Sequence, residues 1–389
     1  MNRTQRVTLV ALVLGTAVAG VLGLVAFGAR SQGPLAQVLA DVGSAVGGAE
    51  GRVVRRVRGG GRAQQLRWFA SMRADSARLR NPDLVLLGAY DDGLPRTLQG
   101  VVELENHLGT AFPLIQIYTA WGDKPEQQFP IQLVRAISDL GSVPVVTWEP
   151  WLTDFENRLH PHLPLRHQRD RGGLAAIARG EYDFYLDEWA GAAAEWGKPI
   201  FVRWGHEMND PYRYPWGPQN NKAEDYIAAW RHVVQRFRRA GANNVIWVWS
   251  PHVAYEYPEA FYPGDDVVDW VATGALNYGT VARWSDWWSF EEIYTSKREH
   301  LTRWKKPVMI AEFGSLAVGG DRKAWFRDAL SELPQRHPEI KALLFFNVAS
   351  DATATQQSLD WTFQQDSTTV STVAGAVASW RTAGTATPR

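Results

Sequence analysis

Beyond residue 81 the chain alternates between short apolar runs and longer amphipathic stretches. This alternation is typical of βα units around a parallel sheet. Most of the runs are apolar on both alternating faces, as expected of parallel strands that are buried on both faces. Eight runs can be counted, and they begin at Leu84, Pro113, Val143, Pro199, Asn244, Asp269, Pro307 and Ala342. Eight such units predict an α/β fold, a (β/α)8 TIM barrel over residues 81–381.

The stretches between the runs have helical character. The stretch from Ala223 to Gly241 places apolar side chains at helical spacing, namely Ile227, Trp230, Val234 and Phe237. A doubly wound open sheet is the alternative architecture. It is disfavoured because no Gly-rich fingerprint of the G-x-G-x-x-G or P-loop type follows any of the runs.

The N-terminus has the pattern of a membrane-directed segment. Arg3 and Arg6 precede a run of 23 uncharged residues, from Val7 to Ala29. This run is longer than the core of a signal peptide and reaches the ~20 residues that span a bilayer as a helix. We expect residues 1–30 to form a signal anchor, with a cleaved signal peptide as the alternative. Either would place the following domain outside the cytoplasm.

Residues 31–66 connect this segment to the predicted barrel. They are rich in Gly, Ala and Val, and they end in a cluster of arginines at positions 52, 55, 56, 58 and 62. We expect a flexible, basic and solvated linker, and contact of the arginines with anionic lipid or wall polymer is the alternative. The folded domain is expected to cover residues 67–385.

Charge balance and residue usage exclude several classes of protein. Basic and acidic residues number 41 each, whereas a nucleic-acid binder would carry an excess of Lys and Arg. Cysteine is absent, which excludes disulfides, thiolate metal sites and a cysteine nucleophile. The chain has an aromatic excess of 19 Trp, 12 Tyr and 15 Phe, with many of the Trp near predicted strand ends. Aromatic surfaces of this kind suit sugar rings.

The residues at the ends of the predicted strands are the candidates for chemistry, because the βα loops of a barrel meet on that face. They are carboxylates, aromatic rings and amides: Tyr90, Asp91, Asp92, Trp121, Trp148, Glu149, Trp151, His206, Glu207, Asn209, Ser250, His252, Asn277, Tyr278, Glu312 and Asn347. No triad of histidines or carboxylates stands out among them as metal ligands. We therefore expect neither a metal nor another cofactor.

Two of these carboxylates form a candidate catalytic pair. Glu207 ends the fourth predicted strand and Glu312 ends the seventh. Side-chain alternation puts Glu312 on the face of Ile310 and Val308, and Glu207 on the face of Arg203, so that both can point inward. Such a pair suits glycoside hydrolysis, in which one carboxylate attacks the anomeric carbon and the other protonates the leaving oxygen. Arg203 is expected to keep one of the two charged.

The sequence around this pair resembles glycoside hydrolase family 26. The run R-W-G-H-E-M-N at residues 203–209, followed by Y-P-W-G at residues 214–217, is similar to the acid/base motif of that family. A-E-F-G at residues 311–314 is similar to its nucleophile motif. V-D-W-V at residues 268–271 and D-W at residues 360–361 follow the expected order.

The resemblance implies a retaining (β/α)8 enzyme in which Glu207 is the acid/base and Glu312 the nucleophile. It also implies that His206 and Tyr278 contact the sugar in the catalytic subsite and the nucleophile. Trp216 matches an aromatic residue that flanks this subsite.

Further residues bear on the substrate. Trp148, Trp216 and Trp284 are expected to be sugar-stacking platforms, with packing between helices and loops as the alternative. Glu149 stands where several β-mannanases of the family carry His, and Asp210 stands where they carry Gly. Both residues add negative charge near the cleft, which disfavours acidic polysaccharides.

These observations predict an exported, membrane-tethered, retaining endo-β-glycoside hydrolase that acts on a neutral β-glycan. β-1,4-Mannan is the first expected substrate, and mixed-linkage β-glucan is the second. A hydrolase that trims the exopolysaccharide of its own cell is the closest rival. A non-catalytic glycan-binding protein and a membrane scaffold are rivals from other classes, and the presence of both Glu207 and Glu312 argues against the former.

Overall fold

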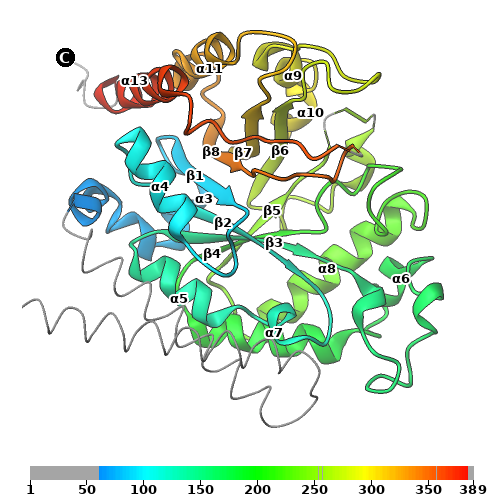
Figure 1. The fold of residues 1–389 in the computed structure, drawn as a ribbon. Helices are drawn as coiled ribbons and strands as arrows, with labels where there is room; N and C mark the ends of the chain where they lie inside the picture. Colours follow the sequence, from blue (N-terminus) through cyan, green and yellow to red (C-terminus); the bar gives the residue numbers. More distant parts are fainter. Residues whose placement is uncertain (1–60, 253, 256, 356, 384–389) are drawn as a thin grey trace, which may run out of the picture. The chain divides into compact units, whose positions relative to one another are not determined.

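The computed structural model describes residues 61–252, 254–255, 257–355 and 357–383. Within these residues, parallel strands close into a barrel in chain order (Figure 1). The strands are β1 (Leu86–Asp91), β2 (Leu114–Ala120), β3 (Val143–Glu149), β4 (Ile200–Trp204), β5 (Val245–Trp249), β6 (Trp270–Asn277), β7 (Val308–Ser315) and β8 (Ile340–Asn347). The predicted TIM barrel is confirmed. The open sheet is wrong, because β1 pairs with β8 along its whole length.

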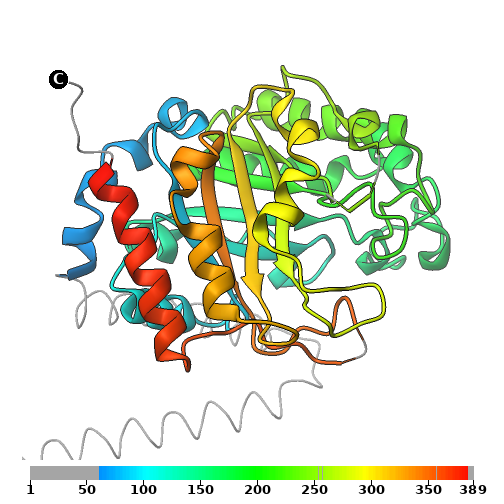
Figure 2. The same ribbon diagram turned by 90° about the horizontal axis from the view of Figure 1, so that it is seen from above.

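Helices connect the strands and cover the outside of the barrel. The α-helices are α3 (Ser76–Arg80), α4 (Gln99–Leu108), α5 (Ile131–Asp139), α6 (Gly173–Ala178), α7 (Asp183–Trp196), α8 (Ala223–Arg239), α9 (Phe290–Thr295), α10 (Arg298–Thr302), α11 (Arg322–Leu330), α12 (Leu333–Arg336) and α13 (Ser367–Ala383). The 3-10 helices are η1 (Arg67–Phe69), η2 (Met72–Ala74), η3 (Pro125–Gln127), η4 (Leu152–Asp154), η5 (Arg166–Gln168) and η6 (Pro258–Phe261). Helix α8 confirms the predicted amphipathic helix, and Figure 2 shows α11 (orange) beside α13 (red).

The buried side chains of the strands divide between two apolar cores. The inner core fills the barrel and includes Phe201 of β4, Ile246 of β5 and Met309 of β7. The outer core lies between the strands and the helices and includes Val202 of β4 and Ile310 of β7. This division follows from the alternation of side chains along each strand.

Tryptophans near the strand ends mostly belong to the outer core. Trp148 has no exposed surface and stacks on Trp189 of α7, with ring centroids 4.4 Å apart. Trp204 and Trp249 are also fully buried, and Trp204 stacks on Tyr226 of α8. The idea that the aromatic excess forms a sugar-binding surface is therefore wrong at these positions, where the indoles fill the space between strands and helices.

An irregularity in β7 decides which way Glu312 points. The register with β8 shifts between Ile310 and Phe313. Met309 and Ala311 belong to the inner core whereas Ile310 belongs to the outer core, so regular alternation would turn Glu312 outward. An extra residue in a strand reverses the alternation beyond it. The predicted sharing of one face by Glu312 and Ile310 is wrong, and the bulge directs Glu312 inward.

Residues ahead of β1 close the amino end of the barrel. Leu66 and Leu79 belong to the inner core, and the carbonyl of Leu79 accepts a hydrogen bond from Trp270 at 3.0 Å. Arg62 forms an ion pair of 2.8 Å with Glu105 of α4, and its side chain is only 10% exposed. The packed domain thus includes residues that the sequence assigns to a solvated linker.

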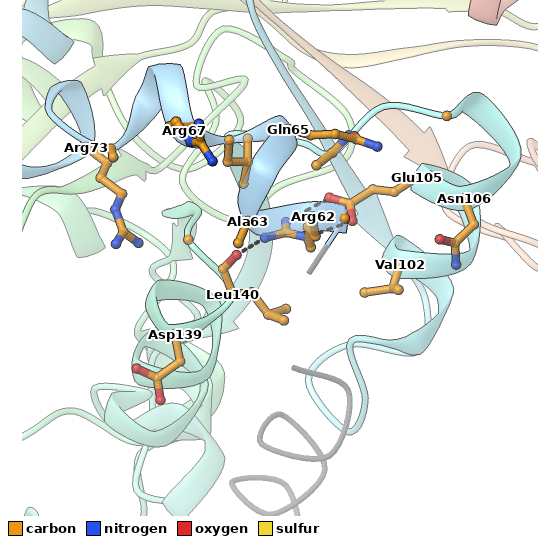
Figure 3. Close-up of a pocket in the computed structure, with 16 residues that line it drawn as sticks. Arg62, Ala63, Gln65, Arg67, Arg73, Val102, Glu105, Asn106, Asp139 and Leu140 are labelled. Carbon is orange, nitrogen blue, oxygen red and sulfur yellow. Dashed lines mark hydrogen bonds and ion pairs between the residues drawn. The ribbon is translucent and has the colours of Figure 1, made fainter. Parts of the chain in front are cut away.

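A cavity of about 640 Å³ lies beside the ion pair of Arg62 and Glu105 (Figure 3). Its walls include Ala111 and Gly141, which precede β2 and β3. It therefore lies at the amino end of the barrel, whereas the catalytic residues of such barrels lie at the carboxyl end.

The predicted membrane-directed segment, residues 1–30, lies outside the described residues, as does most of the predicted linker. Within the part of the chain that is described, we find no helix with the length and apolar character needed to cross a bilayer. Anchoring therefore stays a prediction from the sequence.

Candidate active site

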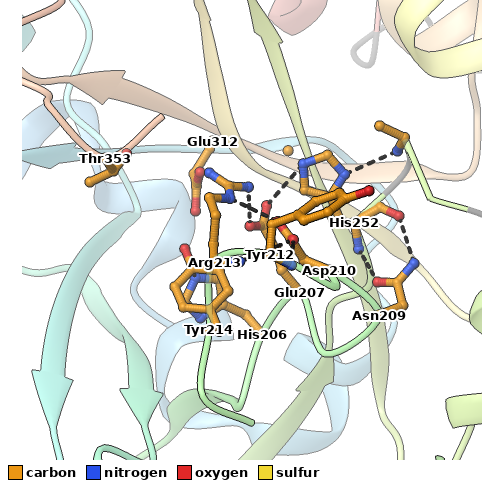
Figure 4. A network of polar contacts seen from close by, with 12 residues as sticks. His206, Glu207, Asn209, Asp210, Tyr212, Arg213, Tyr214, His252, Glu312 and Thr353 are labelled. Atoms are coloured by element: carbon orange, nitrogen blue, oxygen red, sulfur yellow. Dashed lines mark hydrogen bonds and ion pairs between the residues drawn. The ribbon is translucent and has the colours of Figure 1, made fainter. Parts of the chain in front are cut away.

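Glu207 and Glu312 lie at the carboxyl end of the barrel. Glu312 belongs to β7, and Glu207 follows β4. Both side chains are mostly buried, with exposed fractions of 12% for Glu312 and 8% for Glu207. Figure 4 shows them on either side of the Arg213 guanidinium group. The fold thus brings to one face two carboxylates that are 105 residues apart in the sequence.

Glu312 is held by two hydrogen-bond donors from neighbouring strands. Its Oε1 accepts from the Tyr118 hydroxyl of β2 at 2.7 Å and from Arg203 Nη2 of β4 at 2.5 Å. Burial alone would raise the pKa of Glu312. The charge of Arg203 and these hydrogen bonds outweigh burial and hold the pKa below its usual value. Glu312 is therefore a carboxylate kept in its ionised form.

Replacement of Arg203 by Met should move the acidic limit of activity to higher pH. Arg203 favours ionised Glu312, so its loss raises the pKa of that carboxyl, and the reactive form then requires a higher pH. Loss of the partner of a buried charge should also lower the free energy of unfolding at neutral pH by about 3–5 kcal/mol. The pH dependence of kcat/KM and urea unfolding measure the two effects. Arg203→Lys is the control that keeps the charge, and an unchanged pH profile in folded Arg203→Met would remove this role.

Glu207 sits in a tight turn that leaves the barrel. Gly205 and Glu207 both have positive φ angles, of 49° and 53°. A left-handed conformation is uncommon for a residue with a side chain and is found at functional sites. The backbone N–H of Glu207 donates to Ser250 O at 2.6 Å, which fixes the turn to the end of β5. The direction of Glu207 is therefore set by this turn and not by the alternation of β4.

Arg213 and His252 lie beside the Glu207 carboxylate. Arg213 Nη2 lies 2.6 Å from Glu207 Oε2, and His252 Nε2 lies 3.9 Å from Oε1. Together with Asp210, Glu207 and His252 form a group of possible metal ligands within 4.8 Å of one another. Arg213 forms hydrogen bonds with both carboxylates of this group. Its Nη2 donates to Glu207 Oε2, and its Nε donates to Asp210 Oδ2 at 2.8 Å. The chemistry of this group is therefore that of an ion-pair cluster.

His206 is a buried, neutral imidazole. Its Nε2 lies 3.1 Å from the Tyr214 hydroxyl, and its Nδ1 has no hydrogen-bond partner among the described residues. Burial lowers its pKa well below the usual value, and the nearby charges of Arg203 and Arg213 lower it further. His206 can thus orient neighbouring groups but does not carry a charge at neutral pH.

Glu149 adds a third carboxyl group to the site. It ends β3, and its Oε2 accepts a hydrogen bond from Trp151 Nε1 at 3.0 Å. Burial raises the pKa of Glu149 to about 7, and the charges of Glu312 and Glu207 act in the same direction. Glu149 therefore changes its charge near neutral pH, and its charge interacts with those of both candidate catalytic groups.

The Glu149→Gln variant should be more stable than the wild type at pH 8 and gain nothing at pH 4. As pH rises from 4.5 to about 7, the unfolded chain loses the Glu149 proton while the folded chain retains it, so the wild type loses stability. The full difference is at most about 3 kcal/mol, at 1.36 kcal/mol for each pH unit. Urea unfolding at the two pH values measures it, with exposed Glu195→Gln as the control. An equal gain at both pH values would contradict the assignment.

The aromatic residues predicted to bind sugar divide into buried and exposed ones. Trp148 faces the helices, and Trp216 is 2% exposed, stacked on Tyr214 at 4.6 Å and bonded to His206 O. Neither indole presents a free face, so their prediction as platforms is wrong. Trp284 is 55% exposed and lies edge-on to Tyr278, with centroids 5.1 Å apart. Its open face agrees with a platform.

Comparison with known proteins shows which family the site region resembles. Residues 184–326, which contain both Glu207 and Glu312, match glycosyl hydrolase family 26. Over this segment the chain is similar to glycoside hydrolase family 26. The solved structure of a GH26 β-mannanase from Bacteroides ovatus superposes on this chain with a TM-score of 0.56 and 16% sequence identity. The match covers 80% of this chain and 93% of that one. At this identity the likeness shows the fold alone.

Two sequence relatives of the chain carry different enzyme names. The chain is 31% identical over 222 residues to endoglucanase H from Acetivibrio thermocellus, which is 54% of this chain and 22% of that protein. It is 37% identical over 161 residues to mannan endo-1,4-β-mannosidase A and B from Caldalkalibacillus mannanilyticus, which is 39% of this chain and 28% of that protein. The matched segments thus span less than a third of each relative.

Two residues of the site were missed by sequence reasoning. Tyr118 lies on β2 and Arg213 lies in the loop after β4, and each contacts one of the paired carboxylates. Side-chain alternation along β2 could have pointed to Tyr118, because Tyr118 lies on the same face of the strand as Leu114 of the inner core. Arg213 offered none, because its position depends on the course of a loop.

Proposed function

We propose that this chain is a retaining, endo-acting β-glycoside hydrolase with Glu312 as nucleophile and Glu207 as acid/base. The observation that carries the proposal is the environment of Glu312. Arg203 and Tyr118 hold it ionised at the barrel mouth, and its counterpart Glu207 lies within the same matched family segment. A pair of carboxylates in which one stays ionised is what double displacement requires.

The reaction would proceed in two steps. The Glu312 carboxylate attacks the anomeric carbon while the glycosidic C–O bond breaks, and the leaving oxygen takes the proton of Glu207. In the second step Glu207 removes a proton from water, and the water oxygen attacks the anomeric carbon and releases Glu312. The proton given up by Glu207 is thereby restored, and no cofactor takes part.

A neutral β-glycan is the proposed substrate, with β-1,4-mannan first and mixed-linkage β-glucan second. The mannosidase and endoglucanase names of the two relatives support these choices. The carboxyl groups of Glu149, Glu207 and Glu312 at one end of the barrel disfavour anionic polymers by repulsion. A cell's own exopolysaccharide is the alternative substrate.

Exposed aromatic rings near the carboxylates support sugar binding. Tyr212 is 78% exposed and neighbours Arg213 in the loop after β4, and Trp284 is 55% exposed in the loop after β6. Open aromatic faces bury the apolar side of a sugar ring. We propose that these two rings, in place of Trp148 and Trp216, carry the stacking contacts.

We also propose that the protein works outside the cytoplasm. The support is the uncharged run from Val7 to Ala29, which follows Arg3 and Arg6. A span of this length suits a signal anchor or an export signal. Intact cells that express the chain with an N-terminal or a C-terminal tag can be treated with an external protease. Cleavage of the C-terminal tag would support the proposal, and protection of the barrel and its tag would reject it.

Release of reducing ends by the purified full chain tests the activity. Mannan, mixed-linkage β-glucan and β-1,3-xylan are compared, with Glu312→Ala beside the wild type to exclude contaminants. We expect strong release from one polymer, rapid loss of viscosity, and a β-anomer as first product by NMR. If the folded protein releases no reducing ends from any of the three polymers but binds glycans on an array, a non-catalytic glycan-binding protein would be favoured.

A further inference from the structure

The two oxygens of the Glu312 carboxylate have different surroundings. Oε1 accepts hydrogen bonds from the Tyr118 hydroxyl at 2.7 Å and from Arg203 Nη2 at 2.5 Å. Among the described residues, these two are the hydrogen bonds that the carboxylate accepts, and none reaches Oε2. Each oxygen of a carboxylate has two lone-pair sites. Both sites of Oε1 are therefore taken, whereas those of Oε2 are available.

The Tyr118 hydroxyl is fixed as a donor to Glu312. It accepts a hydrogen bond from Arg203 Nη2 at 3.1 Å, so its own proton is left for Oε1. Burial raises the pKa of Tyr118 well above its usual value, and the charge of Glu312 raises it further, so the hydroxyl keeps this proton. The Arg203 guanidinium lies over the Tyr118 ring, and its Nε donates to Thr147 Oγ1 of β3 at 3.0 Å. Both donors are thus held in place by the barrel.

The free oxygen of Glu312 is turned toward Gly274 of β6, which pairs with Glu312 in register. Ala272 belongs to the inner core and Ala275 to the outer core, so a side chain at position 274 would point into the barrel. A Cβ atom there would lie 3.9 Å from Glu312 Oε2 and 3.9 Å from Glu312 Cβ, and no other described residue would come within 4 Å of it. The missing side chain therefore leaves space beside Oε2.

Tyr118 is a different tyrosine from the one that the family resemblance places at the nucleophile. That residue, Tyr278, lies edge-on to Trp284 and Trp361, with ring centroids 5.1 Å and 4.9 Å away. Among the described residues, the tyrosine hydroxyl that donates to Glu312 comes from β2. The group that orients this carboxylate therefore lies across the barrel from β7.

We propose that Tyr118 is a positioning residue that fixes the Glu312 carboxylate so that Oε2 attacks an anomeric carbon bound over Gly274. This proposal rests on the proposed function, in which Glu312 is the nucleophile. In the first step a bond forms between Oε2 and the anomeric carbon, and the leaving group departs with the electron pair of the broken C–O bond. Oε1 becomes the carbonyl oxygen of the ester and keeps both hydrogen bonds. When water attacks the anomeric carbon, the electron pair of the ester bond returns to Oε2.

The Tyr118→Phe variant tests the positioning role. Without the hydroxyl the carboxylate can turn away from its reactive orientation, so kcat on the best polysaccharide should fall by about 10²-fold. KM should stay near the wild-type value, because the lost contact is made to Glu312 and not to the sugar. An unchanged kcat in folded Tyr118→Phe would overturn the proposal.

Tyr294→Phe is the matched control. Tyr294 and Arg298 share Glu339 Oε1 as Tyr118 and Arg203 share Glu312 Oε1, but Glu339 precedes β8 at the amino end of the barrel. The control removes a hydroxyl from the same kind of cluster and should keep wild-type kcat and KM. An equal fall of kcat in both variants would show a general effect of lost packing and would overturn the role of Tyr118.

Variants of Gly274 test the space beside Oε2. Gly274→Ala adds a Cβ in ordinary contact with Glu312, so we expect it to fold. Its kcat/KM should fall by about tenfold or more because the anomeric carbon is displaced, and Gly274→Val should lose more. Gly191→Ala on α7, where an added Cβ meets no atom within 4 Å, should keep the wild-type value. Wild-type kcat/KM in folded Gly274→Val would overturn the proposal.

The crystal structure of a trapped intermediate identifies the attacking oxygen. Dinitrophenyl 2-deoxy-2-fluoro-β-glycosides, in mannose and glucose forms, carry a reactive leaving group, and the fluorine slows the second step so that the ester accumulates. We expect the ester on the oxygen that faces Gly274, with the other oxygen still hydrogen-bonded to Tyr118 and Arg203. An ester on the oxygen held by Tyr118 and Arg203 overturns this proposal and leaves the proposed function standing. A wild type that neither reacts with these glycosides nor cleaves any β-glycan overturns the proposed function and this proposal with it.

Discussion

Replacement of Glu312 by Ala should lower kcat/KM on the preferred polysaccharide by about 10⁴-fold or more. In the proposed mechanism Glu312 supplies the oxygen that attacks the anomeric carbon, and Arg203 and Tyr118 donate hydrogen bonds to its carboxylate. Azide should enter the space left by the side chain and attack an activated β-glycoside directly. Direct attack inverts the anomeric centre, so the product should be the α-glycosyl azide.

Two controls make this result specific. Glu195→Ala removes an exposed carboxylate from α7 and should keep full activity. Circular dichroism should show that Glu312→Ala is folded, because the variant leaves Arg203 buried without its partner. A folded Glu312→Ala protein that cleaves polysaccharide at nearly the wild-type rate would exclude Glu312 as the nucleophile.

Replacement of Glu207 by Ala should lower activity on polysaccharide by about 10²- to 10⁴-fold, the usual contribution of general acid–base catalysis. The loss arises because the sugar leaving group can no longer be protonated. With a dinitrophenyl β-glycoside, whose leaving group needs no proton, the first step should stay fast and the covalent intermediate should accumulate. Azide should then attack that intermediate and give the β-glycosyl azide.

The anomers of the two azide products distinguish the two roles. An α-azide from Glu312→Ala and a β-azide from Glu207→Ala assign nucleophile and acid/base as proposed. The opposite pairing would show that the roles are exchanged. Mass spectrometry of Glu207→Ala with the activated substrate should show one added sugar per chain, and its absence would argue against a covalent intermediate.

Sequence alone was sufficient for the architecture. Runs with apolar residues on both alternating faces mark strands buried on both faces, and each of the eight runs coincides with a barrel strand, from β1 to β8. The signal is strong because burial on both faces is a property of the strand itself. The same applies to α8, whose apolar spacing is visible without knowledge of its neighbours.

The direction of individual side chains was less predictable. Alternation counted from Val308 turns Glu312 to the wrong face, because the bulge between Ile310 and Phe313 cannot be read from the residues. Trp148 and Glu149 are neighbours on β3 and therefore point to opposite faces. Once Glu149 is known to point into the barrel, alternation explains why Trp148 faces α7. A one-residue shift exchanges the two faces of a strand.

The sequence by itself determined the eight-stranded barrel, the placement of Glu207 and Glu312 at strand ends, and Arg203 as a neighbouring charge. Only the tertiary structure decided that Tyr118 and Arg203 share Glu312, that Arg213 pairs with Glu207, and which aromatic rings are exposed. The physical reason is the range of the interactions. Apolar patterning is local to each strand, whereas these contacts join strands and loops far apart in the chain and depend on register, bulges and loop course.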